Sequence, residues 1–217
     1  MDIQYLGHSC FKLKGKSGSV VMDPFGDVGF SIGTVSADII TVSHGHDDHS
    51  NVKAVSSTSR REKPFVIAEP GEYEIEGISV FGYQSSHDGK KGDERGENVL
   101  FVVQIEGIRV LHLGDLGHEL SDSVIETLNG IDVLLVPVGG FYTIDSKQAL
   151  KVIESISPSI AIPMHYKTDK HGKEFEKLST LGEFVKLYGS EPRKVEDKLS
   201  VSSLSIGEDI TEIVVFN

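Results

Sequence analysis

Residues 44–49 read HGHDDH and directly follow the apolar run ADIITV. Chance would place a His-x-His-x-Asp-His pattern in such a chain at a frequency of roughly one in a thousand. Imidazole nitrogens and carboxylate oxygens are ligands that Zn²⁺, Mn²⁺ and Fe²⁺ accept. If the apolar run is a strand, His44 and His46 project to one side of the following loop, and a turn brings Asp48 and His49 around. The stretch therefore predicts a metal site.

Ligands crowded into one short loop cannot all surround a single ion without strain, so the motif predicts either one site with spectators or two sites. Further ligands follow other apolar runs: His87 follows VFGYQSS, Asp115 follows RVLHLG, and His165 follows AIPM. Each alone is weak evidence, because a lone histidine after a strand is more often a packing or surface residue. Together with the motif, they complete two metal sites at the ends of several strands.

Short apolar runs and turns alternate along the segments that must position these residues. The first half reads as strands and hairpins, including a hairpin at IEGIRV, with one short helix in residues 50–59. Helices and strands then alternate as helix 121–130, strand 131–138, helix 146–156 and strand 159–164. One or two short helices follow Lys173, and the strands LSVSSLSI and TEIVVF close the chain. This order predicts two sheets packed face to face, with helices on the outside.

Composition limits the classes of function. A chain of 217 residues with 38% hydrophobic and 25% charged residues is most simply a single domain, residues 1–217. The net charge of −12 offers no general basic face for nucleic acid. No apolar run approaches a membrane span, and the start shows no secretory pattern, so we expect a cytoplasmic protein without a membrane partner. The single Cys10 agrees with a reducing compartment and is expected to be a small buried residue.

The chain resembles the metallo-β-lactamase superfamily, whose signature is His-x-His-x-Asp-His followed in order by a His, an Asp and a His. DPF, PGEYEIEG, GD, PVGGFYT and PMHY are similar to motifs of its ascorbate-6-phosphate lactonase-like branch. The resemblance covers nearly the whole chain. It implies an α+β fold, a four-layer αββα sandwich of two mixed sheets with outer helices and the metals at one edge.

The resemblance also implies two divalent metal ions, with Zn²⁺ expected first and Mn²⁺ or Fe²⁺ as alternatives. The implied ligands are His44, His46 and His87 for the first ion, Asp48, His49 and His165 for the second, and Asp115 as a bridge between them. Such ions lower the pKa of a bound water to about 7, so that hydroxide attacks an electrophilic carbonyl or phosphorus at neutral pH. Asp48 is also the candidate catalytic residue, since its carboxylate is suited to orient the nucleophile or accept its proton.

Other polar residues keep two interpretations. His8 and His112 lie near predicted strand ends, where they either support a ligand or simply pack. Asp23 either accepts hydrogen bonds beneath the metal loop or begins a turn before a proline. We expect His118 to be a polar residue at the start of a helix and His171 to lie at the surface.

Residues expected near the substrate flank the metal motifs. The charged loop 87–98 is typical of a solvated hairpin tip, and its cations are expected to attract an anion. These cations are Lys90, Lys91 and Arg95. Further candidate substrate contacts are Tyr142, Thr143, Tyr166 and Lys167.

The leading hypothesis is a metal-dependent hydrolase of a small ester, lactone or phosphorylated molecule, and both neutral and anionic small molecules fit this hypothesis. A phosphodiesterase or nuclease of the same superfamily and a non-catalytic metal-binding protein are the alternatives. A di-iron oxidoreductase is weaker, because such relatives place a Glu at the position of His46 and carry a flavin domain. The sequence leaves the substrate, the metal and a homo-oligomeric state open.

Overall fold

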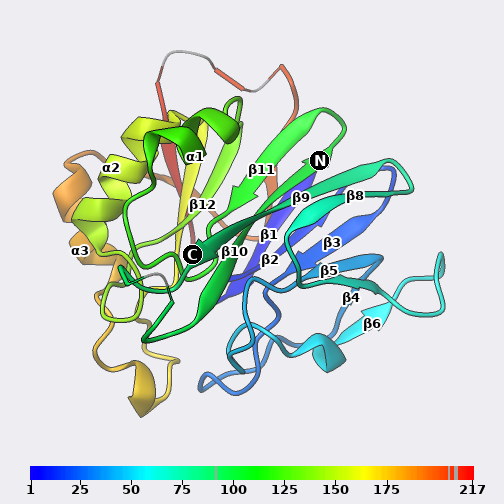
Figure 1. The fold of residues 1–217 in the computed structure, drawn as a ribbon, viewed down its shortest axis with the longest axis horizontal. Helices are drawn as coiled ribbons and strands as arrows, with labels where there is room; N and C mark the ends of the chain where they lie inside the picture. The colour runs from blue at the N-terminus through cyan, green and yellow to red at the C-terminus, as the bar shows by residue number, and fades with distance from the viewer. Residues whose placement is uncertain (91, 205, 208–209) are drawn as a thin grey trace.

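The computed structural model of the chain describes residues 1–90, 92–204, 206–207 and 210–217 (Figure 1). A six-stranded sheet comes mainly from the N-terminal part. Its strands, in spatial order, are β15 (Leu199–Ser200), β1 (Asp2–Gly7), β2 (Cys10–Lys14), β3 (Ser19–Met22), β5 (Ile39–Thr41) and β7 (Phe65–Ile67). β2 pairs antiparallel with both β1 and β3, and β3 pairs parallel with β5. Strands β1, β3 and β5 therefore run in one direction and end at the same edge.

An eight-stranded mixed sheet packs against the first. Its strands, in spatial order, are β14 (Arg193–Val195), β16 (Glu212–Phe216), β13 (Ile160–Met164), β12 (Val133–Pro137), β11 (Ile108–His112), β10 (Glu97–Ile105), β9 (Ile78–Ser86) and β8 (Gly71–Ile75). β10 is antiparallel to β9 and β11, whereas β11, β12 and β13 are parallel. Strands β9, β11 and β13 therefore also end at one edge. The expected hairpin is confirmed, and its turn residues Glu106 and Gly107 both have positive φ, as a two-residue hairpin turn requires.

Alternating side chains of β10 face two different cores. Phe101 and Val103 point between the two sheets, where they meet Phe11 and Leu13 of β2. The intervening Leu100 and Val102 of β10 face the helical side instead. This period of two follows from the pleat of a strand, and both sets are buried because each face of the second sheet is covered.

Three helices lie on the outer face of the second sheet: α1 (Asp122–Thr127), α2 (Ser146–Ile156) and α3 (Leu181–Tyr188) (Figure 1). In α2, Ala149, Val152 and Ile153 are buried at helical spacing. Asp145 caps this helix by accepting hydrogen bonds from the first-turn backbone. Among the described residues, no helix is long and apolar enough to cross a membrane.

The outer side of the first sheet is built differently. The short helix expected in residues 50–59 is a single 3₁₀ turn, η1 (Val52–Ala54), after which β6 (Val55–Ser57) pairs in parallel with β4 (Val35–Ala37). The β-branched Val55 packs well in a strand, and the serines after it are poor helix formers. A second 3₁₀ turn, η2 (Lys173–Phe175), adds Phe175 to the apolar cluster on this side. The α+β sandwich with outer layers is confirmed.

Candidate metal centre

Each predicted metal-site residue directly follows a strand. In the first sheet, His8 follows β1, Asp23 follows β3, and the HGHDDH motif follows β5. In the second sheet, His87 follows β9, Asp115 lies just beyond β11, and His165 follows β13. Because the strands of each set run in one direction, their ends share an edge, and the structure brings all seven predicted ligands together there.

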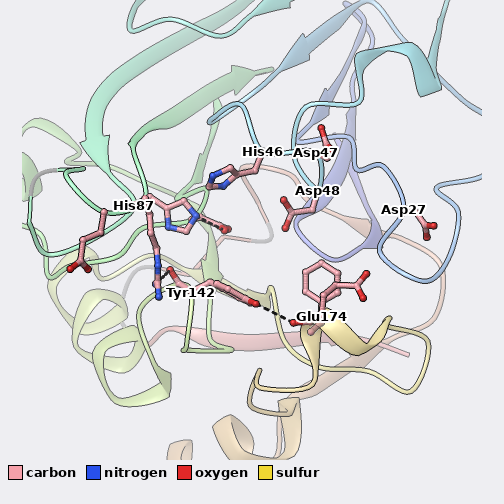
Figure 2. Close-up of a pocket in the computed structure, with 11 residues that line it drawn as sticks. Asp27, His46, Asp47, Asp48, His87, Tyr142 and Glu174 are labelled. Atoms are coloured by element: carbon pink, nitrogen blue, oxygen red, sulfur yellow. Dashed lines mark hydrogen bonds and ion pairs between the residues drawn. The ribbon is translucent and has the colours of Figure 1, made fainter.

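The first group of ligands is His44, His46 and His87, whose candidate ligand atoms all lie within 4.8 Å of one another. The His44 ring centroid lies 4.7 Å from that of His46 and 4.9 Å from that of His87. His87 is buried, whereas His46 is exposed and lines the cavity shown in Figure 2. This group therefore opens toward solvent on the His46 side.

The second group contains Asp48, His49 and His165, together with His8, again with ligand atoms within 4.8 Å of one another. His49 and His165 are fully buried, and their rings are stacked with centroids 5.7 Å apart. His8 was not among the predicted ligands, although its place near a strand end was recognised.

Asp115 lies between the two groups. Its Oδ2 is 3.2 Å from His87 Nε2 in the first group, and its Oδ1 is 3.2 Å from His49 Nε2 in the second. Its Oδ2 is also 3.3 Å from His165 Nε2. Yet Asp115 Oδ1, His49 Nε2 and His165 Nε2 are buried without a hydrogen-bond partner. Buried polar atoms without partners are rare in folded proteins, and converging lone pairs of this kind fit a cation.

The charges of the centre are strongly coupled. Burial raises the pKa of Asp115, but His165 and His49 outweigh burial and hold it well below its usual range. Burial lowers the pKa of His49, but Asp115 and Asp23 raise it well above its usual value. Burial and the neighbouring His49 lower the pKa of His44 to about 3. His44 is therefore neutral at neutral pH, as a metal ligand must be.

Asp23 supports ligands of both groups from beneath. Its Oδ2 accepts a hydrogen bond from His49 Nδ1 at 2.7 Å. The backbone amide and hydroxyl of Ser43 also donate to this carboxylate, at 2.8 and 2.5 Å. Because the Ser43 hydroxyl gives its proton to Asp23, it accepts from His44 Nδ1 at 2.9 Å. Both histidines thereby carry a proton on Nδ1, and Nε2 is the nitrogen that each turns toward the centre. Asp23 thus accepts hydrogen bonds beneath the candidate ligands, which is the first of the two interpretations drawn from the sequence.

Two buried side chains brace the loop that carries Asp115. His112 Nε2 donates to the Ser9 carbonyl at 2.8 Å, and His112 Nδ1 accepts from the Gly114 amide at 2.9 Å. Asn98 Oδ1 accepts from the Asp115 amide at 3.0 Å. A Cβ on Gly114 would lie 2.3 Å from Asn98 Oδ1, so this position requires glycine. Sequence reasoning missed Asn98, whose only signal is an amide at the start of the apolar run NVLFVV.

The loop after His87 joins the antiparallel strands β9 and β10, and most of its described residues are exposed or half-buried, as expected of a hairpin tip. It is nevertheless ordered internally around Asp88. The buried Asp88 carboxylate accepts hydrogen bonds from the backbone amides of Lys90, Gly92, Glu94 and Arg95, at 2.7 to 3.0 Å. Burial raises the pKa of Asp88, but these four amides outweigh it and lower it to about 2. The carboxylate thereby fixes the path of the chain from His87 to Arg95.

A cavity of about 410 Å³ opens above the ligands. His46, Asp48, His87 and Asp115 are among its lining residues. Figure 2 shows Tyr142 near His87, with Asp27 and Glu174 on the opposite side, beyond Asp48. The Tyr142 hydroxyl donates to the Glu174 carbonyl at 3.1 Å and so closes the lower rim of the cavity.

Of the two described cations that were expected to meet an anion, Arg95 lines the cavity and Lys90 does not. The Arg95 guanidinium donates to the Tyr142 carbonyl at 2.8 Å and lies 5.6 Å from the Tyr142 ring centroid. Lys90 is exposed and pairs with Glu94 at 2.5 Å. Lys91 lies outside the described residues.

Two other expected substrate contacts lie elsewhere, and Thr143 is absent from the cavity lining. Tyr166 is buried in the core beneath the helices, and the Lys167 amine reaches the Glu176 carbonyl. His118 precedes α1 and contacts Ser85 and the Glu119 carbonyl. These contacts keep His118, Tyr166 and Lys167 away from the candidate ligands.

Comparisons with known proteins agree with the fold. A profile of the β-lactamase superfamily domain matches residues 2–165. The chain is 32% identical over 209 residues to a UPF0173 metal-dependent hydrolase of Archaeoglobus fulgidus, covering 82% of this chain and 90% of that protein. It is 34% identical over 197 residues to a relative of the same description from Thermoplasma volcanium, covering 77% and 85% of the two chains.

A solved structure from Thermotoga maritima, described as a candidate Zn-dependent hydrolase of the metallo-β-lactamase superfamily, superposes with a TM-score of 0.78 at 35% identity. The match covers 100% of this chain and 98% of that one. The sandwich with a His/Asp edge is thus that of the metallo-β-lactamase superfamily. Within it, the chain belongs to the UPF0173 metal-dependent hydrolases, and it is a metal-dependent hydrolase.

Proposed function

We propose that the protein holds two divalent metal ions and hydrolyses a small ester, lactone or phosphorylated substrate. The observation that carries this proposal is Asp115, whose carboxylate faces His87 of one ligand group and His49 of the other. A carboxylate in that position is suited to bridge two ions. The first ion would be held by His44, His46 and His87, and the second by Asp48, His49 and His165. Imidazole and carboxylate suit Zn²⁺, Mn²⁺ and Fe²⁺ alike, and Zn²⁺ is our first choice.

Such ions supply a water whose pKa is lowered to about 7, and they polarise the bond to be broken. The chain contributes Asp48, which lines the cavity with its side chain 24% exposed. Burial raises the pKa of Asp48, but His8 and His49 outweigh burial and hold it well below the usual range. Asp48 is therefore ionised at neutral pH, and its carboxylate orients the attacking water and accepts its proton.

The cavity favours a small substrate with an anionic group. Its volume of about 410 Å³ is in the range of small-molecule sites. Arg95 presents a guanidinium that its contacts with Tyr142 hold in place, which suits a carboxylate or phosphate. The motifs similar to the ascorbate-6-phosphate lactonase-like branch favour a lactone or ester that carries such a group. Asp27, Asp47 and Glu174 also line this cavity and disfavour a nucleic-acid polyanion.

The test combines metal analysis with turnover. Protein loaded with Zn²⁺ or Mn²⁺ should hold about two equivalents and hydrolyse members of a panel of lactones, esters and phosphodiesters. Asp48→Asn should retain at least one equivalent and lose turnover. Arg95→Met should raise KM for phosphorylated substrates while leaving KM for uncharged esters unchanged. Full metal content without turnover of any panel member would instead support a non-catalytic metal-binding protein.

A further inference from the structure

His8 is a buried histidine beside the second ligand group. Its candidate ligand atom lies within 4.8 Å of those of Asp48, His49 and His165, so by distance alone it completes a four-ligand metal site. Its ring centroid is 4.3 Å from that of His165. Its Nε2, however, is also 3.2 Å from Asp48 Oδ2. A nitrogen that carries a proton donates to the carboxylate, whereas a nitrogen that binds a metal must be free of that proton.

A hydrogen-bond chain from outside the centre decides which nitrogen of His8 carries the proton. The Thr168 amide lies 3.0 Å from His171 Nδ1, and a backbone amide can only donate. His171 Nδ1 is therefore an acceptor, and its ring proton is on Nε2. His171 Nε2 lies 3.2 Å from His8 Nδ1, so His171 donates and His8 Nδ1 accepts. The proton of His8 is then on Nε2, which faces Asp48.

Neighbouring residues hold both histidines of this hydrogen-bond chain in place. The His171 ring lies between Phe30 and Phe175, with centroids 5.2 Å from each. The expectation that His171 lies at the surface was thus wrong: it is half-buried. The His8 carbonyl accepts from the Tyr5 hydroxyl at 2.8 Å and from the His165 amide at 2.9 Å, which holds the His8 backbone at φ 52°.

We infer that His8 is a positioning residue that donates its Nε2 proton to Asp48, with His171 fixing its tautomer, and that it is not a metal ligand. The functional consequence rests on the role proposed for Asp48. Asp48 lies at the cavity, where its carboxylate is free to rotate unless one oxygen is held. The hydrogen bond from His8 Nε2 holds Asp48 Oδ2 in place, so that Asp48 Oδ1 is directed away from His8.

The tautomer of His8 is measurable in metal-free protein by long-range ¹H–¹⁵N correlation spectra of ¹⁵N-histidine-labelled chain, with His8→Gln used to assign its signals. We expect a single neutral tautomer protonated on Nε2. After Zn²⁺ is added, the Nε2 signals of the ligand histidines should shift as those nitrogens bind metal, while His8 Nε2 keeps its proton. An Nδ1 proton on His8, or a metal-bound Nε2, would overturn the inference.

Two substitutions separate a donor from a ligand. Gln at position 8 places an amide donor near the position of His8 Nε2, whereas Leu offers no donor. Both substitutions are made at the same backbone position with positive φ. We expect both variants to keep the parent's Zn²⁺ stoichiometry. His8→Leu should lower kcat by about 10- to 100-fold with KM within about two-fold, the range typical for residues that orient metal ligands. His8→Gln should recover most of that loss.

Loss of the same metal equivalent in both variants would make His8 a ligand and refute the inference. Equal kcat losses without rescue by Gln would refute the donor role. Neither outcome touches the proposed hydrolysis, which fails only if the metal-loaded parent has no turnover. The tautomer measurement needs neither turnover nor a folded Leu variant.

Discussion

The two ligand groups of the centre differ in how their side chains are held. In the second group, His49 is fixed by Asp23 at 2.7 Å and Asp48 by His8 at 3.2 Å. In the first group, Ser43 holds His44 at 2.9 Å, but the exposed His46 side chain makes no hydrogen bond within the described part of the chain. His87 Nδ1 of the first group and His165 Nδ1 of the second are both buried without a partner. Hydrogen bonds thus orient two ligands of the second group and one ligand of the first.

From this difference we expect a more tightly held ion in the second group and a more readily exchanged one in the first. Ligands whose orientation is fixed in advance lose less conformational freedom on binding, and outer hydrogen bonds typically change metal affinity by about 10- to 100-fold. We therefore expect the second group to hold its ion more tightly than the first. The open first group also lies beside Arg95 in the cavity lining, so exchange and substrate binding share one entrance.

Asp115→Ala should have the largest effect, because it removes the one carboxylate that faces both groups. We expect the difference between the groups to vanish as both lose affinity, with activity falling by at least about 1000-fold, or about 4 kcal/mol of transition-state stabilisation. Elemental analysis and turnover measure the two effects. Asp47→Ala is the matched control, since Asp47 is a neighbouring exposed acid of the same cavity. Two retained equivalents in Asp115→Ala would refute the bridge.

Asp23→Asn should have the next largest effect and act mainly on the second group. Asn offers one acceptor oxygen where Asp23 offers two, so it cannot accept from both the Ser43 amide and His49 Nδ1, and the hold on His49 is weakened. We expect the Kd of the tighter ion to rise by about 10- to 100-fold, measured by competition with a chromophoric chelator.

Asp38→Asn is the control for that experiment. Asp38 is another buried acid, which accepts hydrogen bonds from the amide and hydroxyl of Ser19 and from Thr58. Ser19 begins β3 and Asp23 follows its end, so Asp38 lies at the opposite edge of the sheet. This variant should lose stability and keep its metal affinity. Equal changes in affinity would mean that Asp23 acts only through general stability.

Titration of the metal-loaded parent with a chelator should reveal a smaller effect. We expect the two metal equivalents to leave in two separate steps. We expect the first equivalent to leave at a free-metal concentration about ten times higher than the second, equivalent to about 1.4 kcal/mol. His46→Ala should abolish only the early step, because the ion of the second group has its own ligands. A single step for both equivalents in the parent would contradict the asymmetry.

The sequence predicted which candidate ligands come together better than which residues support them, and for a physical reason. A metal ligand must be His, Asp, Glu or Cys, so HGHDDH and the strand-end residues were recognisable from type and spacing. A supporting residue needs only one suitably placed donor or acceptor. Asn98 and Ser43 therefore look like ordinary polar residues until the strands are placed in register. His171 contacts His8 from a position 163 residues away, and such contacts depend on tertiary structure.

Fold prediction shows the same limit. Strands with continuous apolar runs, such as β10, and the capped helix α2 were predicted from local pattern. The segment after the metal motif was not, because the pairing of Val55 with β4 decides between helix and strand there. The Asp88 loop is the exposed hairpin tip that its polar composition predicted, but that composition gave no sign of its internal order. The Asp88 carboxylate accepts hydrogen bonds from four backbone amides, and these bonds order the loop.

The smallest expected effect is the pH dependence of that loop. The pKa of Asp88 is lowered to about 2 from its unperturbed value of 3.8, so the ionised carboxylate stabilises the folded state. This contribution is fully present above the unfolded pKa and is lost as pH falls through the folded pKa. The difference in unfolding free energy between the parent and Asp88→Asn should therefore be constant above about pH 5 and shrink as pH falls from about 4 toward 2.

Urea unfolding of metal-free protein measures that difference without a contribution from bound ions. Because Asp88 also accepts from the Arg95 amide, Asp88→Asn should loosen Arg95 as well. KM for a phosphorylated substrate should then rise, while chelator titration of the second ligand group stays at the parent value. A rise in KM with an unchanged second step would place the loop with the open, first half of the centre. A weakened second step would show that the two halves are not independent.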